Sequence, residues 1–342
     1  MAAAVMIVVA AVTGCSASKP DPGSITLVMA DSFSAKHPVG KGGMHKFLAY
    51  VTEHGPAVGL KLEYYGAGQL GKQSEMATLV RSRAVDLGTI IPSYLANELP
   101  LSGIGDLPGL STDPCAATEA IAPMMRPGGA VYTEELESRG LHPLWGVTIS
   151  GLEVMTSEKR IETPEDLHGT VIRAAGGVSD RVLRGLGAAP VSLPAGDLYE
   201  AIARKTVGGL MTSKYVIPSY SLQDEIRYST LGADLGATTA WLTMSSAAWG
   251  ELNEAQRRVV SDGAAVAQAG ACQELAKAEA AAVETLRAAG VEFVEITPEG
   301  RQKWDEALSG IRQEWVDDLE SVGIPARSVL TGLEQRLSEV QR

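Results

Sequence analysis

Two stretches of this chain alternate short apolar strands with helices, and this pattern restricts the fold more than any other feature. In the first stretch, strand patterns at 24–29, 60–65 and 84–91 enclose two helical patterns. In the second stretch, strand patterns at 170–174, 189–193 and 207–212 do the same. Strands that alternate with helices predict parallel sheets whose faces are covered by helices. We therefore expect an α/β protein with two such units.

A long alanine-rich segment follows these units. It runs from 246 to about 289 as one helical pattern. At about 1.5 Å per residue, a helix of that length is longer than one small domain is wide. The chain has 342 residues, which suggests two domains of ordinary size. The helix is long enough to span two lobes.

The first residues have the pattern of an export signal. Residues 2–12 (AAAVMIVVAAV) are apolar throughout, which is too short to span a bilayer but matches the core of a signal peptide. The run ends in VTGC, and small residues before Cys15 resemble a lipoprotein cleavage site. Cleavage would leave a lipid-modified Cys15 and a flexible tether at 16–23, holding an extracytoplasmic domain at the cell membrane. The usual basic residues before the run are missing, and a buried N-terminal helix is the alternative.

Charge and composition argue against several classes of partner. Lys and Arg total 29 against 41 Asp and Glu, a net charge of −12. Such a chain lacks the clustered cations that nucleic acids or anionic membrane surfaces require. Aromatic residues are only 5% of the chain, which disfavours a sugar cleft or a platform for stacked bases. We expect no nucleic-acid partner, and membrane contact only through the lipid anchor.

No metal or cofactor site is expected. The five histidines show no metal-ligand spacing, and no P-loop, G-x-S-x-G or H-E-x-x-H motif occurs. After Cys15, only Cys115 and Cys272 remain. They could form a disulfide in an oxidising compartment or remain two isolated buried thiols, and the sequence leaves both open.

One glycine-rich loop offers an alternative function. The segment from Gly66 to Gly71 (GAGQLG) follows a strand pattern and precedes a helical one, as in the dinucleotide-binding fingerprint. The strand before it is half polar, whereas a central parallel strand is nearly all apolar. No acidic residue ends the next strand, where a ribose would be held. A dinucleotide-dependent enzyme that uses this loop is kept as the alternative to a binding protein.

Arg173 is the most informative single residue. It lies near the C-terminal end of the apolar strand pattern 170–174. Open α/β sheets bind ligands at that end of their strands. A partly buried guanidinium keeps its charge and needs a partner, and a ligand carboxylate can accept two of its N–H groups at once. An internal salt bridge to a protein carboxylate is the alternative.

Several motifs, in their order along the chain, resemble those of one family. They are GQLG at 68–71, RIETPEDLHG at 160–169 with VIR at 171–173, LGAAPV at 186–191, DLYEA at 197–201, and W-x-x-L-x-x-x-Q at 249–256. Together they resemble the solute-binding subunits of TRAP transporters, of the DctP type. The resemblance covers nearly the whole mature chain.

The resemblance implies a non-catalytic binding protein of two lobes, each a sheet flanked by helices, with the long helix across both. A small solute, usually an organic acid, would be captured between the lobes and delivered to a small and a large membrane subunit. Lobe I would take 24–150 and 237–276; lobe II would take 151–236, with 277–342 packed on it. The lobes would close about hinges near Ser150 and near 235–236. A sensor that presents the closed lobes to a receptor is a further alternative.

The resemblance also assigns candidate site residues. Arg173 stands where the family grips the solute carboxylate. Thr212 stands where the family commonly has asparagine, so one hydroxyl replaces an amide. Glu153 stands where several acid-binding members place a second arginine; in the cleft it would favour a zwitterionic or hydroxylated solute, and a surface loop is the alternative. The remaining candidates by position are Phe33, Gln73, Tyr94 and Trp145, with Ile91 as an apolar wall.

Overall fold

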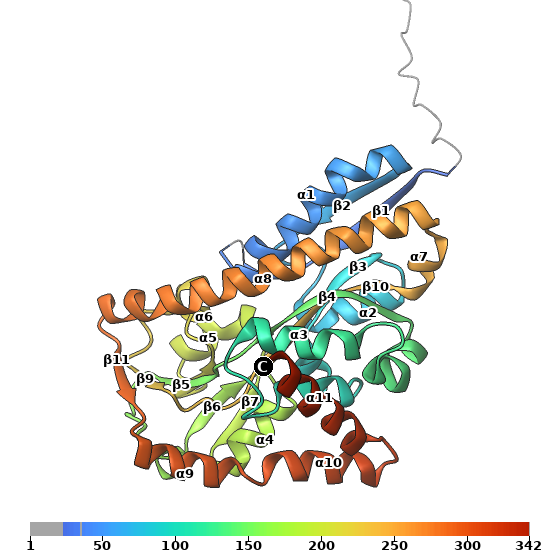
Figure 1. Ribbon diagram of the computed structural model, residues 1–342. Helices are drawn as coiled ribbons and strands as arrows, with labels where there is room; N and C mark the ends of the chain where they lie inside the picture. Colours follow the sequence, from blue (N-terminus) through green and yellow to red (C-terminus); the bar gives the residue numbers. More distant parts are fainter. Residues whose placement is uncertain (1–22, 35, 342) are drawn as a thin grey trace, which may run out of the picture.

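Two sheets, each flanked by helices, form the two lobes of the molecule (Figure 1). The computed structural model describes residues 23–34 and 36–341. The predicted signal sequence, Cys15 and the tether before residue 23 lie outside the described residues. In the part that is described, no helix is both long and apolar enough to cross a membrane. The expected two-lobed α/β architecture is confirmed.

The first sheet has five strands in the order β2-β1-β3-β10-β4. β1 is parallel to β2 and β3, as the alternation of strands and helices predicts, whereas β10 is antiparallel to β3 and β4. The strands are β1 (Ile25–Ala30), β2 (Leu60–Tyr65), β3 (Leu87–Ile90), β4 (Leu141–Ile149) and β10 (Thr238–Ser245).

The second sheet has six strands in the order β11-β9-β5-β8-β6-β7. β6 is parallel to β7 and β8, and β5 is antiparallel to β8 and β9. The strands are β5 (Glu153–Thr156), β6 (Val171–Ala174), β7 (Ala189–Ser192), β8 (Gly209–Thr212), β9 (Tyr228–Leu231) and β11 (Glu292–Glu295).

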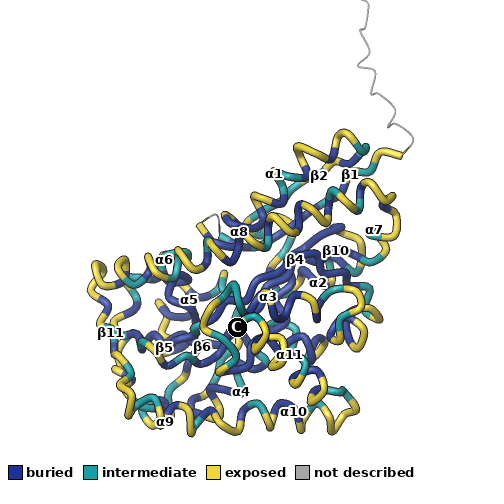
Figure 2. The backbone as a smooth tube through the Cα atoms, in the orientation of Figure 1, coloured by how far each residue is buried: buried dark blue, intermediate teal, exposed yellow. Residues whose placement is uncertain are grey.

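Helices cover the sheets, so that the inner strands are buried, whereas the outer helix faces and parts of the edge strands β2, β7 and β11 are exposed (Figure 2). The central strand β3 and the edge strand β4 are buried along their whole length, as strands with covered faces must be. The helices before the long one are α1 (His45–His54), α2 (Met76–Arg81), α3 (Pro114–Met125), α4 (Val178–Gly185), α5 (Leu198–Ala203), α6 (Val216–Ser219) and α7 (Ser246–Glu251). Short 3-10 or π turns lie at η1 (Gly40–Met44), η2 (Gly55–Val58), η3 (Gln73–Glu75), η4 (Pro92–Leu95), η5 (Leu101–Asp106), η6 (Tyr132–Leu136), η7 (Glu137–Arg139), η8 (Pro164–Leu167) and η9 (Ala195–Asp197).

The long helix α8 (Glu254–Ala288) runs beside both lobes (Figure 1). It begins later than the sequence pattern predicts, because Asn253 caps it: the Asn253 side chain accepts the Gln256 amide at 3.0 Å. The Gln256 side chain in turn accepts the Asn253 amide at 3.0 Å, which completes a capping box. Farther along, α8 touches η1 backbone to backbone, since a Cβ on Gly270 would lie 2.2 Å from the carbonyl oxygen of Gly42.

The chain crosses between the sheets at β4–β5, at β9–β10 and along α8. The first two crossings are bonded to each other: the Leu235 amide donates to the Leu152 carbonyl at 2.9 Å, and the Leu152 amide donates to the Gly236 carbonyl at 3.2 Å. Both predicted hinge positions lie in these crossings. The hinge motion itself stays a prediction.

The C-terminal segment does not pack on lobe II alone. α9 (Pro298–Leu308) and α10 (Ile311–Ser321) contact α4 and η8, which belong to the second lobe. α11 (Ala326–Val340) instead packs against α3, which covers β4 of the first sheet. Its buried face, which includes Val329, Leu333 and Leu337, joins the core there. The expectation that all of 277–342 packs on lobe II is therefore wrong for α11.

A disulfide joins Cys115 to Cys272, which settles the alternative that the sequence left open. The two Cα atoms are 5.1 Å apart, and 157 residues separate them along the chain. Cys115 begins α3 and Cys272 lies in the middle of α8. The bond therefore ties the long helix to the first lobe.

Replacing both Cys115 and Cys272 by alanine should destabilise the protein by about 2–5 kcal/mol, because the cross-link restricts a long loop in the unfolded chain. Thermal unfolding measured without reductant checks this, and the wild type treated with reductant should approach the variant. Thiol titration of the unreduced, unfolded domain that finds both Cys115 and Cys272 free would contradict the disulfide.

Asp106 is a buried carboxylate at the end of η5. Its Oδ1 accepts the Thr239 amide at 2.9 Å, and its Oδ2 accepts the Ser93 hydroxyl at 2.5 Å. Burial raises its pKa from 3.8 to about 7, although these hydrogen bonds act in the opposite direction. The folded protein thus retains a proton that the unfolded chain loses at lower pH.

The free energy of unfolding should therefore contain a component that is fully present below about pH 4 and is lost as the pH rises through about 7. Asp106→Asn should remove this component, so that its unfolding temperature changes less than that of the wild type between pH 5 and pH 8. Asp224→Asn, at an exposed position, is the matched control and should behave as the wild type. An unchanged pH dependence in Asp106→Asn would assign the effect to other groups.

Candidate functional site

A cavity of about 200 Å³ lies between the lobes. Its walls come from both, with Ser32, Phe33, Ala67, Gly68, Gly71, Lys72, Gln73, Ile91 and Tyr94 from the first lobe and Pro194, Ala195, Gly196, Asp197 and Tyr220 from the second. The lobes also touch directly beside it, where the Ser34 hydroxyl donates to the Ser219 carbonyl at 3.0 Å. Three of the predicted candidates, Phe33, Gln73 and Tyr94, line this cavity, and Ile91 forms part of its apolar wall.

Arg173 is not among the residues that line the cavity, but it contacts Tyr94, which is. β6 carries Arg173 between two parallel strands, and it is 3% exposed. Its Nε donates to the Leu193 carbonyl at 2.8 Å, and its Nη2 donates to the same carbonyl and to the Tyr94 hydroxyl, the latter at 3.3 Å. None of the described carboxylates lies within ion-pair distance of it, and its Nη1 has no hydrogen bond to a described residue. The internal salt bridge that was the alternative is therefore not formed within the described chain.

An aromatic wall that the sequence did not predict stands beside Phe33. The Phe33 ring stacks on His37 with centroids 4.2 Å apart, and His37 meets Tyr215 and Tyr220 edge to face at 5.3 Å and 6.3 Å. Burial lowers the pKa of His37 to about 3, so this ring is neutral at physiological pH. Burial also raises the pKa of the Tyr220 phenol, which keeps its proton. The wall is therefore uncharged and suits a flat apolar group.

Gln73 is held by its own neighbours. Its Oε1 accepts the Ser32 hydroxyl at 2.5 Å, and its Nε2 donates to the Thr89 carbonyl. Both ends of the amide are thus engaged inside lobe I. Ser32 and Gln73 therefore form a fixed polar edge of the cavity, and the Ser32 hydroxyl oxygen can accept a further hydrogen bond.

Thr212 ends β8 and is buried, at 5% exposure. It lies opposite Glu153 in the antiparallel pair of β5 and β8. Neither residue is among those that line the interlobe cavity. Thr212 and Glu153 are neighbours because of the register of β5 and β8, and this pairing does not place either of them in the interlobe cavity.

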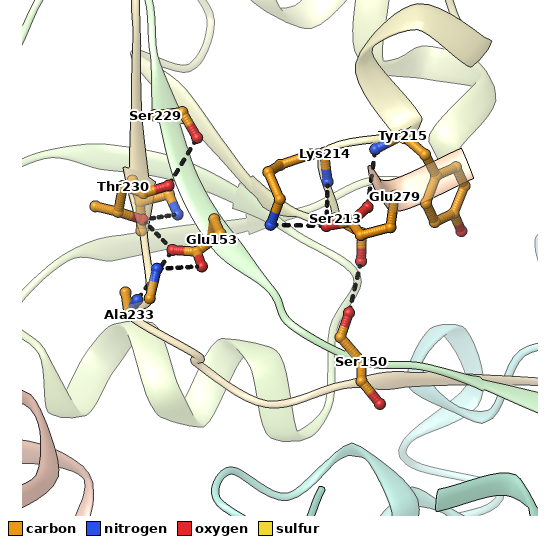
Figure 3. A network of polar contacts seen from close by, with 11 residues as sticks. Ser150, Glu153, Ser213, Lys214, Tyr215, Ser229, Thr230, Ala233 and Glu279 are labelled. Carbon is orange, nitrogen blue, oxygen red and sulfur yellow. Dashed lines mark hydrogen bonds and ion pairs between the residues drawn. The ribbon is translucent and has the colours of Figure 1, made fainter. Parts of the chain in front are cut away.

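Glu153 is turned toward the β9–β10 crossing (Figure 3), and it is not among the residues that line the interlobe cavity. Its carboxylate accepts the Thr230 hydroxyl at 2.6 Å and the amides of Gly232 and Ala233 at 2.8 Å and 3.1 Å. Burial raises its pKa, and the charge of Lys214 and these hydrogen bonds oppose that rise. Three donors already satisfy the carboxylate, so the expectation that it faces the solute is not met. The surface alternative is also wrong, since Glu153 is 3% exposed.

Lys214 and Glu279 form the other half of this polar network (Figure 3). The Lys214 ammonium lies 2.7 Å from Glu279 Oε1, and the amides of Lys214 and Tyr215 donate to the same carboxylate at 3.3 Å and 3.1 Å. Glu279 belongs to α8. The long helix therefore holds the segment that carries Tyr215 into the aromatic wall.

Trp145 is a core residue and not a ligand contact. It is 0% exposed in β4, and its ring lies against Gly43, where a Cβ would approach it to 2.2 Å. Alternate residues of a strand face opposite sides, and the side that Trp145 faces is covered by η1. Its predicted place in the site is therefore wrong.

The glycine-rich loop does not have the setting of a dinucleotide site. It follows β2, which is an edge strand of its sheet, and leads into the 3-10 turn η3 before the short helix α2. The dinucleotide fingerprint instead joins a central strand directly to a helix N-terminus. Here Ala67, Gly68 and Gly71 line the interlobe cavity. Within 23–34 and 36–341, no cluster of three or more His, Cys, Asp or Glu side chains could hold a metal.

Comparisons with known proteins agree with this arrangement. Residues 29–318 match the family described as bacterial extracellular solute-binding protein, family 7 (DctP). A curated solute-binding protein of Albidiferax ferrireducens is 27% identical over 252 residues, which is 72% of each chain.

Solved structures share the fold. A TRAP solute-binding protein of Rhodoferax ferrireducens, in complex with copurified benzoate, is similar with a TM-score of 0.83 at 21% identity, over 93% of this chain and 99% of that one. A marine metagenome TRAP protein specific for aromatic acid ligands, in complex with 3-hydroxybenzoate, has a TM-score of 0.84 at 20% identity, over the same shares. The match to the family spans most of the chain. The protein therefore belongs to the DctP family, whose members are the extracellular solute-binding proteins of TRAP transporters.

Proposed function

We propose that this protein captures a small organic acid with a flat apolar body between its lobes and delivers it to the membrane subunits of a TRAP transporter. The observation that carries the proposal is Arg173, a buried cation with no carboxylate partner among the described residues, behind an aromatic-walled cavity. In this proposal the chain performs no catalytic step.

The guanidinium would bind the solute carboxylate. Its Nη1 has no hydrogen bond to a described residue, and its Nη2 is shared with Tyr94. A carboxylate bonded to both groups supplies the missing negative charge with charge-assisted hydrogen bonds. Lobe closure excludes water from the pair and so strengthens it.

The remainder of the cavity would select the body of the solute. Phe33, Ile91 and Tyr220 offer apolar and aromatic surface, whereas Ser32 offers one polar oxygen. A volume of about 200 Å³ is smaller than pockets for drug-sized ligands, which measure roughly 300–1,000 Å³. Benzoate and 3-hydroxybenzoate, the ligands of the two similar solved proteins, have this chemistry.

Arg173→Ala should weaken the binding of benzoate or 3-hydroxybenzoate by about tenfold to a hundredfold, because a hydrogen-bonded charge pair is lost. Arg173→Lys keeps the charge but loses the planar fork, and should recover only part of the affinity. Isothermal titration calorimetry measures the dissociation constants. Arg204→Ala, at an exposed position, is the control that should leave them unchanged. Equal affinities for the wild type and Arg173→Ala would contradict the clamp.

We also infer that Cys15 is lipid-modified and tethers the domain to the cell membrane. The support is the sequence pattern before it, since VTGC follows an apolar run, and the membership of an extracellular family.

Cys15→Ser should move the protein from the membrane fraction to the soluble extracytoplasmic fraction, because a serine accepts no thioether-linked lipid. Fractionation followed by intact mass of the membrane-bound wild type checks this. The variant Ser16→Ala keeps the acceptor thiol and should stay on the membrane. A Cys15→Ser protein that remains membrane-bound would rule out this anchor.

A further inference from the structure

Tyr94 stands between two cavities of different character. The inner one is the interlobe cavity of about 200 Å³ described above. The outer one measures about 430 Å³, and it too has walls from both lobes, including Ser93, Asn97, Gly176, Asp180 and Ser192. Tyr94 and Pro194 line both cavities. The tyrosine ring is thus part of the partition between them.

The hydroxyl of Tyr94 fixes the partition across the cleft. It accepts the Ala195 amide at 3.1 Å and Arg173 Nη2 at 3.3 Å, and both donors belong to the second lobe. A phenol oxygen that accepts two hydrogen bonds still has its own O–H to donate. That proton is therefore available to a solute oxygen beside Arg173.

The backbone next to Tyr94 is also seated against the second lobe. A Cβ on Gly176 would lie 2.5 Å from the Ser93 carbonyl oxygen, so only glycine allows this approach. Ser93 is held from the other side by its hydrogen bond to Asp106. Tyr94 thus has little freedom to leave the partition while the lobes are closed.

The two cavities would accept different chemistry. Phe33, Ile91 and Tyr220 form an apolar part of the inner wall, and Lys72 and Asp197 are among its polar lining residues. The outer one is lined in part by Asp180, whose Oδ2 accepts the Ser192 hydroxyl at 2.6 Å and lies 3.8 Å from Arg184 Nη2, and whose buried Oδ1 has no hydrogen-bond partner among the described residues. An apolar ring fits the first, whereas groups that donate hydrogen bonds, such as hydroxyls, fit the second.

We propose that Tyr94 determines the specificity of the site by limiting the solute to the inner cavity. This inference rests on the proposed function, since it assumes that an acid binds beside Arg173. With the ring present, a compact aromatic acid is accepted and a longer hydroxylated acid is excluded. Without the ring, the cavities join, and the hydroxyl groups of a longer acid reach Asp180.

The test compares benzoate with D-glucuronate, an acid that carries several hydroxyls, by calorimetry on the full domain. Tyr94→Ala should lose about tenfold in benzoate affinity and gain measurable glucuronate binding, at least tenfold tighter than in the wild type. Tyr94→Phe keeps the ring and removes only the hydroxyl. It should weaken benzoate binding by roughly tenfold and still exclude glucuronate.

Tyr199→Ala is the matched control, because Tyr199 is 52% exposed and lines neither cavity. It should leave both affinities unchanged. Thermal unfolding verifies that each variant is folded, and Tyr94→Leu replaces Tyr94→Ala if the latter unfolds. A folded small-side-chain variant that still excludes glucuronate, or a Tyr94→Phe variant that accepts it, would overturn the partition. A wild type that binds no acid, with no change in Arg173→Ala, would instead overturn the proposed function and this inference with it.

Discussion

A buried positive charge that lacks a protein counter-ion sets the requirements for the whole cleft. Arg173 bonds to the Leu193 carbonyl and the Tyr94 hydroxyl, which supply dipoles but no negative charge. The cost of burying an ion is repaid only by excellent geometry and an opposite charge. In the proposed function, the solute carboxylate supplies that opposite charge. Because Tyr94 and Leu193 come from different lobes, this set of hydrogen bonds to Arg173 is complete only when the lobes are closed.

The sequence predicted the parts of the fold that depend on local periodicity. The parallel strands of both sheets followed from the alternation of strand and helix patterns, and the burial of Arg173 followed from its place near the end of β6. The interruption before α8 was missed, because the alanine-rich pattern continues through Leu252 and Asn253. Asn253 ends that continuity through its cap, and the sequence signal for this cap is the spacing of Asn253 and Gln256.

Side-chain direction explains where the predicted site was wrong. The resemblance indicates Trp145 and Glu153 only by their position along the chain, and position does not tell which face of a strand a residue occupies or what covers that face. The aromatic wall was missed for a different reason. His37 and Tyr215 are 178 residues apart in the sequence, and only the closed arrangement of the lobes brings them together. No periodicity within either segment indicates this contact.

The β4–β5 and β9–β10 crossings between the lobes are not independent. Leu152 is bonded in both directions to the segment Leu235–Gly236, so the crossings form a short two-stranded ribbon. A ribbon resists relative sliding of its strands but can twist as one body. The long helix α8 is a third connection, since the disulfide fixes it to the first lobe and Glu279 bonds to Lys214 of the second. A change of backbone torsion at 150–152 is therefore coupled to one at 235–236, so that the two predicted hinges would have to move together.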